Sequence, residues 1–294
     1  MVKTVGFVSE KGGVGKTTAC YHIAVALRWF HDKPVLVVDL DYQRGGITCR
    51  FLPELIEDFR NGRMPGVTLY QKFRDLYAGA PFTPAVDIKA TPQNVDLVAG
   101  DPRLAEVSVD KMPASNNIRQ NNRLLWTHLS LLRRVLGPLS DKYEYILIDC
   151  HPEVSDLLRT ALYACDCVVS PVKLDLQSTI GVPTAIQVME EVNEDVAMLR
   201  KAVEGLEDRP PIKFVGAIGM MAREWGGILK WSEQAEYRRL AASGGIFENY
   251  VTEGDGLRQA AAGRIPVYNV RGANAERQAG QFKAVTAEFM QRCV

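Results

Sequence analysis

The 294-residue sequence lacks several features that mark particular classes of protein. It has no run of about 18 apolar residues, so no membrane-spanning helix is expected. Its first expected strand starts at residue 2, which leaves no room for a signal peptide. It has no net charge, with 35 basic and 35 acidic residues, so the whole chain does not attract polyanions. We expect a cytoplasmic protein that binds no membrane and could bind nucleic acid only through a local basic face.

Cysteine is scarce and scattered. None of the six cysteines belongs to a C-x-x-C pair, which argues against a structural zinc or an iron–sulfur cluster. Cys165 and Cys167 stand too close together to change this view. Cys20, Cys150 and Cys167 fall within apolar patterns, and we interpret them as small buried hydrophobic residues.

Residues 10–18, with the sequence EKGGVGKTT, are the most informative stretch of the chain. The preceding segment 2–8 is rich in β-branched and aromatic residues, as in a buried strand, and apolar residues recur at helical spacing over 23–30. A glycine-rich loop between a strand and a helix, ending in Lys-Thr, predicts a phosphate-binding P-loop. Glu10 occupies the place of the first glycine of the usual pattern. The alternative is a glycine-rich turn without a ligand.

The residue types in this loop suggest a role for each position. Glycines let the backbone approach phosphates closely, and their N–H groups together with the helix N-terminus attract anions. Lys16 is expected at the β- and γ-phosphates, Thr17 at Mg²⁺, and Thr18 at the α-phosphate or the helix start. The predicted nucleotide-binding residues of the loop are Gly12, Gly13, Val14, Gly15, Lys16, Thr17 and Thr18.

Acidic residues end two further hydrophobic segments. The segment 34–41 is almost continuously apolar, as in a parallel strand buried on both faces, and it ends with Asp39 and Asp41. The segment 145–149 ends with Asp149, the Walker B arrangement, in which Asp149 would hold Mg²⁺ directly or through water. In a doubly wound sheet these strand ends meet at the ligand crevice. Alternatively, Asp39 or Asp41 caps the turn that follows it.

The rest of the sequence predicts strands alternating with helices. Helices are expected over 52–59, 67–77 (with Thr68 as N-cap) and 124–136, strands over 95–98, 167–172 and 212–218, and a loop over 103–120. About seven alternations predict an α/β fold with a doubly wound, mostly parallel sheet. We expect residues 1–294 to form a single domain, with a less certain helical and loop insertion at about 50–142.

The string KGGVGKTT at 11–18 resembles the deviant Walker A box of the ParA/MinD family of P-loop ATPases. The strings VVDLDYQ (37–43), AGDPRL (99–104) and VVSPV (168–172) also resemble segments of that family. The resemblance implies that Lys11 reaches across a dimer interface to the partner's nucleotide. It also implies that Asp41 positions or activates the attacking water, and that Asp39 supports the Mg²⁺ shell or the P-loop. Lys11 could instead be a solvated surface lysine.

Three positions depart from the family pattern. Tyr42 replaces a proline, His151 stands at the first proline of the D-x-P-P string, and Met220 stands where family members place a Thr or Asn against the nucleotide base. We assign Met220 to the base side of the site, and residues 250–256 align with the family's second base-side loop. His151 could donate a hydrogen bond beside the γ-phosphate, or it could be a partly exposed switch residue; we favour the second interpretation.

The resemblance is greatest to ParA-type partition ATPases, without the N-terminal helix-turn-helix domain that some of them carry. It implies a Mg²⁺-dependent ATP hydrolase that forms an ATP-sandwich homodimer, binds DNA nonspecifically and drives plasmid or chromosome partition with a ParB-like partner. The protein would then be associated with the nucleoid. The candidate DNA-binding residues are Arg223, Lys230, Arg238 and Arg239.

Rival functions would require other features of the sequence. Trp225 and Trp231 interleave with the basic residues, but tryptophans in helices are more often part of the core. The alternative function is a MinD-like or other cargo-positioning ATPase that does not act through DNA. The C-terminal segment 282–290 has mixed charge and resembles a packing helix more than a membrane-binding one. A nitrogenase-reductase-like electron donor would need paired cysteines, which are not evident.

Overall fold

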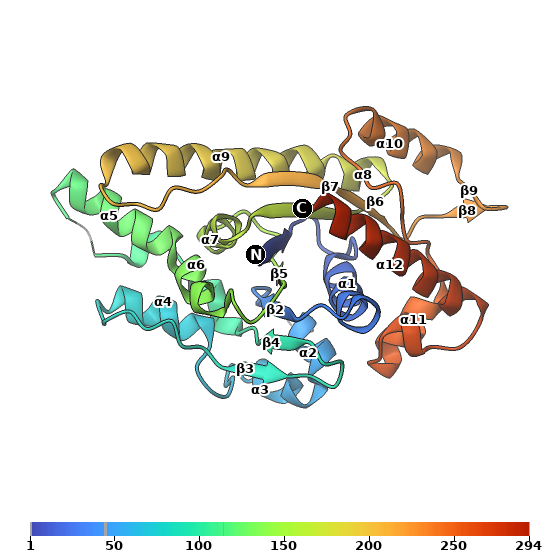
Figure 1. Ribbon diagram of the computed structural model, residues 1–294, viewed down its shortest axis with the longest axis horizontal. Coiled ribbons are helices and arrows are strands. Elements are labelled where there is room, and N and C mark those ends of the chain that lie inside the picture. Colours follow the sequence, from blue (N-terminus) through green and yellow to red (C-terminus); the bar gives the residue numbers. More distant parts are fainter. Residues whose placement is uncertain (1, 44–45, 114, 294) are drawn as a thin grey trace.

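A seven-stranded sheet forms the centre of the computed structural model, which describes residues 2–43, 46–113 and 115–293 (Figure 1). The strand order is β3-β4-β2-β5-β1-β6-β7. β3 pairs with β4 in the antiparallel sense, and the other neighbouring strands are parallel. The strands are β1 (Lys3–Phe7), β2 (Val35–Asp39), β3 (Ile88–Ala90), β4 (Asp96–Val98), β5 (Tyr145–Asp149), β6 (Cys167–Lys173) and β7 (Lys213–Met220).

Helices cover both faces of this sheet (Figure 1). α1 and α12 pack on one face, and α6, α7 and α9 pack on the other. A separate two-stranded hairpin, β8 (Glu224–Trp225) with β9 (Ile228–Leu229), projects beside α10. The helices are α1 (Lys16–His31), α2 (Ile47–Phe51), α3 (Ile56–Arg60), α4 (Leu69–Tyr77), α5 (Ile118–Leu129), α6 (Leu131–Leu136), α7 (Asp156–Ala164), α8 (Leu176–Thr179), α9 (Gly181–Ala202), α10 (Trp231–Ala242), α11 (Asp255–Gly263) and α12 (Ala273–Arg292).

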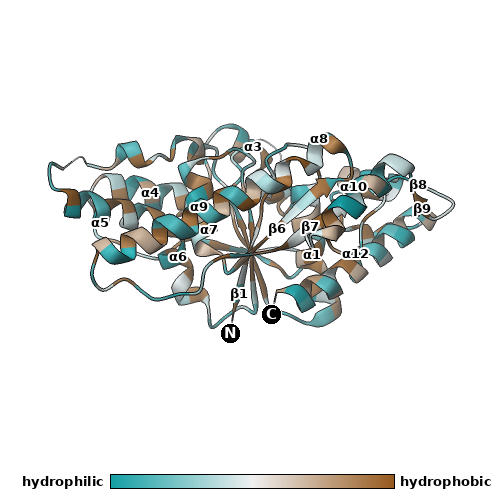
Figure 2. Cartoon of the chain, turned by 90° about the horizontal axis from the view of Figure 1, so that it is seen from above, coloured by the Kyte–Doolittle hydropathy of each residue, from teal (hydrophilic) through white to brown (hydrophobic). Residues whose placement is uncertain are grey.

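The strand sequences explain why both faces are covered. Successive side chains of a strand point to opposite faces. In β2, Val35 and Val37 join the core on the α1 and α12 side, whereas Leu36 and Val38 join the core on the α7 and α9 side. Figure 2 shows the apolar strands at the centre and polar residues on the outer surfaces of the helices. The expected doubly wound, mostly parallel α/β sheet is therefore confirmed.

Some local predictions were wrong. The helix expected over 124–136 begins at Ile118, because the Asn117 side chain accepts hydrogen bonds from two backbone N–H groups there, and the helix is interrupted at Ser130. Leu125, near the start of the expected helix, is 41% exposed. Thr68 is the N-cap residue of α4, as predicted, but its hydroxyl donates to Asp101 at 2.7 Å and makes no capping hydrogen bond. The short strand β3 and the hairpin β8–β9 were not predicted.

The cysteines, potential metal ligands and long helices can be located in the structure. All six cysteines are buried, including Cys20, Cys150 and Cys167, as predicted. Within the described ranges, no group of three or more His, Cys, Asp and Glu side chains could hold a metal ion. No helix in the part of the chain that the structure describes is long and apolar enough to cross a membrane.

Candidate functional site

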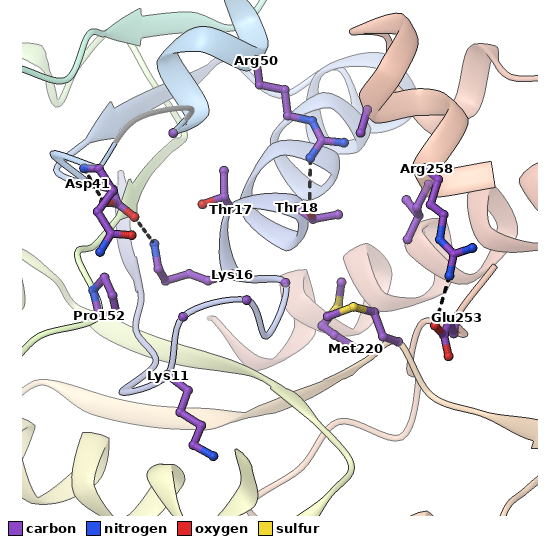
Figure 3. Close-up of a pocket in the computed structure, with 18 of the residues that line it drawn as sticks. Lys11, Lys16, Thr17, Thr18, Asp41, Arg50, Pro152, Met220, Glu253 and Arg258 are labelled. Atoms are coloured by element: carbon purple, nitrogen blue, oxygen red, sulfur yellow. Dashed lines mark hydrogen bonds and ion pairs between the residues drawn. The ribbon is translucent and has the colours of Figure 1, made fainter. Parts of the chain in front are cut away.

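The P-loop connects β1 to α1 at the carboxyl edge of the sheet (Figure 3). Gly13 and Gly15 have φ angles of 74° and 95°, which a residue with a Cβ rarely adopts. A Cβ at Gly15 would also lie 3.3 Å from Met220. Because no side chain caps α1, the first N–H groups of this helix remain available to an anion.

Lys16 lies between the acidic groups that end β5 and follow β2. Its Nζ is 2.6 Å from an Asp149 oxygen and 3.5 Å from an Asp41 oxygen. The Thr17 hydroxyl donates to the other Asp149 oxygen at 2.8 Å. Burial is the largest influence on the pKa of Lys16 and lowers it, but Asp149 and Asp41 together raise that pKa above its ordinary value. Lys16 therefore remains a cation although it is buried.

Asp39 lies behind the pocket and organises the loop that carries Asp41. One carboxylate oxygen accepts from the Asp41 backbone N–H at 3.0 Å, and the other accepts from the Thr48 backbone N–H and hydroxyl at 3.0 and 2.5 Å. Burial, followed by the charge of Asp149, raises the pKa of Asp39 to about 7. Asp39, expected to support the Mg²⁺ shell or the P-loop, does not line the pocket, and its contacts tie Asp41 and Thr48 to the end of β2.

A cavity of about 560 Å³ opens above the P-loop. Most of the predicted P-loop residues line it, as do Asp41 and Met220; Val14 does not, and Asp149 lies beneath Lys16. Its far side is formed by Met221, Leu257 and the ion pair of Glu253 with Arg258, at 3.3 Å. The segment predicted as the second base-side loop thus contributes Glu253 and its neighbour Gly254. This volume is in the range of small-molecule sites.

Arg50 of α2 also lines this cavity, and no sequence motif predicted it there. Its Nη1 donates to the Thr18 hydroxyl at 3.1 Å, and its guanidinium lies 4.5 Å from the centre of the Tyr21 ring. Its Nε and Nη2 are buried without a hydrogen-bond partner among the described residues. Burial lowers the pKa of Arg50 from its ordinary value. The pocket therefore holds a buried guanidinium, with unused donors, beside Thr18.

His151 is buried, contrary to the partly exposed position that we favoured. It is 1% exposed because its ring stacks on Tyr42, with centroids 3.7 Å apart. Its Nδ1 accepts from the Glu153 backbone N–H at 3.2 Å. Burial is the main reason why the pKa of His151 lies below its ordinary value, and Asp41 and Glu153 act in the opposite direction.

Lys11 is exposed and points away from Lys16 (Figure 3). Its Nζ lies 3.4 Å from Gln177 Oε1, on α8. Two large apolar side chains flank Gln177 there: Leu176 is 60% exposed and Ile180 is 56% exposed. The second lysine of the P-loop therefore faces an exposed, partly apolar surface.

The predicted DNA-binding residues lie together around α10 and the hairpin. Arg223 pairs with Glu233 at 2.5 Å and Arg239 with Glu236 at 2.8 Å. Lys230 and Arg238 are exposed and form no ion pair within the described ranges. Trp225 and Trp231, expected in the core, are each 84% exposed, because Trp225 lies in the projecting hairpin and Trp231 begins α10.

The oxygen donors at the P-loop suit Mg²⁺. This ion prefers oxygen ligands, keeps several waters and usually takes few protein groups together with nucleotide phosphates. The Thr17 hydroxyl and the Asp149 carboxylate lie together at the foot of the pocket. These two residues could hold Mg²⁺ only alongside a nucleotide, which agrees with the absence of a larger acidic cluster in the described ranges.

Comparison with known proteins connects this geometry to a family. The AAA_31 family model, described as an AAA domain, matches residues 2–203. The chromosome-partitioning ATPase Soj of Treponema pallidum is 28% identical over 199 residues, which are 65% of this chain and 65%, just under two thirds, of that relative. The chain belongs to the AAA_31 family, within the ParA/MinD group of P-loop ATPases.

Solved structures share the fold of this ParA/MinD-family protein. A complex of Cyanothece McdA with ATP has a TM-score of 0.73 at 17% identity and covers 98% of this chain and 96% of its own. A putative plasmid partition protein of Borrelia burgdorferi bound to AMPPNP has a TM-score of 0.65 at 20% identity, with 99% of both chains covered. A Mycobacterium smegmatis cobyrinic acid a,c-diamide synthase with ADP and magnesium also has a TM-score of 0.65, at 18% identity, over 99% of this chain and 95% of its own.

The family match covers only part of the predicted site. Residues 2–203 include the P-loop, Asp41, His151 and α8. Met220, the Glu253–Arg258 pair and the basic residues around α10 lie beyond it. Family membership therefore applies to the phosphate side of the site, while the base side and the DNA-binding residues depend on this chain's own geometry.

Proposed function

We propose that this ParA/MinD-family protein is a Mg²⁺-dependent ATPase. The arrangement of Lys16 between Asp41 and Asp149, beneath an uncapped helix N-terminus, carries this proposal. The site combines cationic and N–H donors for phosphates with a hydroxyl and a carboxylate for a metal. The ATP and AMPPNP in the structural neighbours support the choice of nucleotide.

Each group of the site then has a role in phosphoryl transfer to water. Lys16 and the N–H groups of the P-loop hold the β- and γ-phosphates, and Thr17 and Asp149 hold Mg²⁺. When bound, the metal neutralises phosphate charge and orients the nucleotide. Asp41, which lines the pocket beside Lys16, positions and deprotonates the attacking water. Asp39 holds the Asp41 loop in place through the Asp41 and Thr48 backbone N–H groups.

We further propose that ATP joins two copies of the protein face to face. Lys11 points out of its own pocket, so it is placed to reach a nucleotide held by a second copy. Val154, Leu176 and Ile180, in the segments that follow the carboxyl ends of β5 and β6, are 56–60% exposed. Burial of these side chains would favour association, at roughly 25 cal/mol for each Å² of apolar surface.

DNA binding by the ATP-bound dimer would serve plasmid or chromosome partition with a ParB-like partner. Lys230 and Arg238 are the exposed cations around α10 that are best able to contact phosphates, because Arg223 and Arg239 are already paired. The partition proteins among the relatives support this function. In the cell the protein would then associate with the nucleoid.

The exposed hairpin favours a second candidate, the positioning of another cargo without DNA. Trp225, Ile228 and Trp231 are 65–84% exposed in one segment. Tryptophans so exposed are uncommon on a surface that contacts only water, and contiguous apolar residues mark contact sites. In this alternative, α10 and the hairpin would bind a protein cargo and the nearby cations would have no DNA to neutralise.

Retention on nonspecific duplex DNA distinguishes the two candidates. The experiment compares ATP with ADP over a salt series, in wild type and in the double variant Lys230→Ala/Arg238→Ala. The matched control is Arg119→Ala/Arg123→Ala, which removes two exposed arginines from α5 at the opposite end of the molecule (Figure 1). The partition function predicts ATP-dependent retention. It also predicts that the slope of log affinity against log salt concentration decreases in magnitude by about two in the α10 variant only. Retention that ignores the nucleotide, or no retention at low salt, would favour the cargo-positioning alternative.

A further inference from the structure

His151 and Tyr42 meet at the edge of the nucleotide pocket. Their rings stack with centroids 3.7 Å apart and planes 12° apart. Each of them stands where the family strings have a proline, and the two positions come from different strand ends, those of β5 and β2. This contact fixes the plane of the imidazole ring, which is 1% exposed. Its neighbours Asp41 and Pro152 line the pocket itself.

The hydrogen bonds of His151 determine which ring nitrogen carries the proton. The Glu153 backbone N–H donates to Nδ1 at 3.2 Å, so Nδ1 is the acceptor and the proton of the neutral ring is on Nε2. This Nε2–H is buried and has no hydrogen-bond partner among the described residues. The nearest acidic oxygen, Oδ1 of Asp41, lies 3.9 Å away, which is too far for a hydrogen bond.

A buried donor without a partner destabilises a folded protein, and native structures rarely keep one without a reason. Here the unused donor faces Asp41, whose other oxygen is 3.5 Å from Lys16 Nζ. The γ-phosphate is expected at this corner, beside Lys16. His151 does not itself line the cavity and its Nε2 has almost no accessible surface, so a phosphate oxygen of the substrate supplies the missing acceptor once the Asp41 side chain turns away from the ring.

We propose that His151 is a further catalytic residue, whose Nε2–H donates a hydrogen bond to an oxygen of the γ-phosphoryl group during ATP hydrolysis. This inference rests on the proposed ATPase function. As the water oxygen bonds to the γ-phosphorus, the bond from phosphorus to the β–γ bridging oxygen breaks, giving ADP and inorganic phosphate. The water proton passes to Asp41 and then to phosphate. The His151 proton stays on the ring.

The role is electrostatic. Donors that are fixed in position and shielded from water stabilise the charge of a transition state, and loss of one such donor costs about 100- to 1000-fold in kcat in well-placed cases. The stack on Tyr42 and the Glu153 N–H fix the ring before substrate binds. Because the same bond would be weaker in the ground state, its loss should lower kcat far more than nucleotide affinity.

Substitution of His151 by Gln or by Asn distinguishes the role of the Nε2–H donor from the role of the ring in packing. In His151→Gln, the amide nitrogen can take the place of Nε2, so part of the donor function should return. In His151→Asn, the shorter amide can still accept from the Glu153 N–H but cannot place a donor at Nε2. His151→Phe keeps an aromatic ring against Tyr42 and removes both polar contacts. Thermal melting checks that each variant is folded.

The experiment measures kcat for ATP, the Kd for ADP, and the Kd for ADP with aluminium fluoride, a mimic of the transferring phosphoryl group. We expect kcat to fall about 100-fold in the Asn and Phe variants and only about fivefold in the Gln variant. The aluminium fluoride complex should weaken in parallel, while the Kd for ADP changes less than about threefold.

Folded Asn and Phe variants that keep wild-type kcat and aluminium fluoride affinity would overturn the role of His151. A Gln variant that loses as much as the Asn variant would also overturn it, because the distal donor would then not be the group that matters. A wild-type protein that binds neither ATP nor ADP would overturn the proposed ATPase function itself, which is a different and separable result.

Discussion

Lys11 and Lys16 belong to the same nine-residue stretch, yet their side chains face opposite sides of the P-loop. Lys16 Nζ lies 2.6 Å from Asp149, inside the molecule, and Lys11 Nζ lies 3.4 Å from Gln177, on the exposed surface of α8. One lysine is therefore placed to serve the nucleotide of its own chain. Among the described residues, Lys11 contacts none of the acidic groups at the pocket of its own chain.

Lys11→Ala tests whether the second lysine acts on another copy. We expect the variant to bind ADP as wild type does, because Lys11 is exposed and lies away from Lys16, but to lose ATP-dependent dimerisation or turnover. The measurement is the molar mass in solution with ATP and with ADP, by light scattering after size exclusion. Lys201→Ala, at the exposed end of α9, is the control. An unchanged ATP-dependent dimer in Lys11→Ala would remove its role in trans.

Asp41→Asn tests the assignment of the water-positioning residue. An Asn keeps an oxygen that can accept from the Gln43 backbone N–H, as Asp41 Oδ1 does at 3.0 Å, so the loop should retain its shape. It cannot take up a proton from water, so we expect kcat to fall about 100-fold or more. ATP binding and dimerisation should persist, and Asp41→Ala should behave in the same way. Normal hydrolysis in either variant would show that another group handles the water.

The phosphate side of the site could be predicted from sequence because its signals are local. A glycine-rich loop, a lysine and strand-terminal aspartates are each visible within a few residues, and the parallel sheet brings them together. The surroundings of His151 and Arg50 could not be predicted in this way. His151 is buried by Tyr42, over a hundred residues away in the chain, and Arg50 belongs to a five-residue helix without periodicity.

The tryptophans show a different kind of error. We expected Trp225 and Trp231 in the core because tryptophan is usually buried and we read the segment as helical. Gly226 and Gly227, both with positive φ, form the turn of the β8–β9 hairpin instead. A Gly-Gly pair between two short extended segments is a hairpin signal, and this interpretation would have placed Trp225 outside a helix.

Arg50→Ala tests the cation that sequence reasoning missed. Its unused Nε and Nη2 donors lie beside Thr18 in the pocket, where the α-phosphate is expected. Loss of a charge-assisted hydrogen bond to phosphate should raise the Kd for ADP about tenfold or more. Arg50→Lys should recover part of the affinity. Arg60→Ala on α3, an exposed arginine paired with Glu57, is the control. Fluorescent ADP titration gives each Kd, and an Arg50→Ala variant with wild-type affinity would exclude a phosphate contact.

His22 should make the stability of the protein fall in mild acid. Its Nε2 accepts from the Val267 backbone N–H at 3.1 Å, so its Nδ1 proton is donated to the Thr18 carbonyl at 2.8 Å. A second proton, on Nε2, would point at the Val267 N–H, so that two hydrogen-bond donors would face each other. Burial, followed by the charge of Arg50, places the pKa of His22 well below its ordinary value, against a smaller effect of the Thr18 carbonyl.

The sign follows from proton counting. Below an unfolded-state pKa of about 6.5 the unfolded chain takes up a proton on His22 while the folded protein does not. The contribution of His22 to the free energy of unfolding should therefore be complete above this pH. It should fall by up to about 1.4 kcal/mol per pH unit as the pH drops towards the folded-state pKa.

Urea unfolding of wild type and His22→Gln between pH 7.5 and 5 measures this contribution. Burial also lowers the pKa of His128 and of His151, so wild type should lose stability through all three groups, and the variant through the two that remain. The informative quantity is the slope against pH, since His22→Gln alters the stability at neutral pH as well. Equal slopes in the two proteins would mean that His22 is not kept neutral by its hydrogen bonds in the folded state.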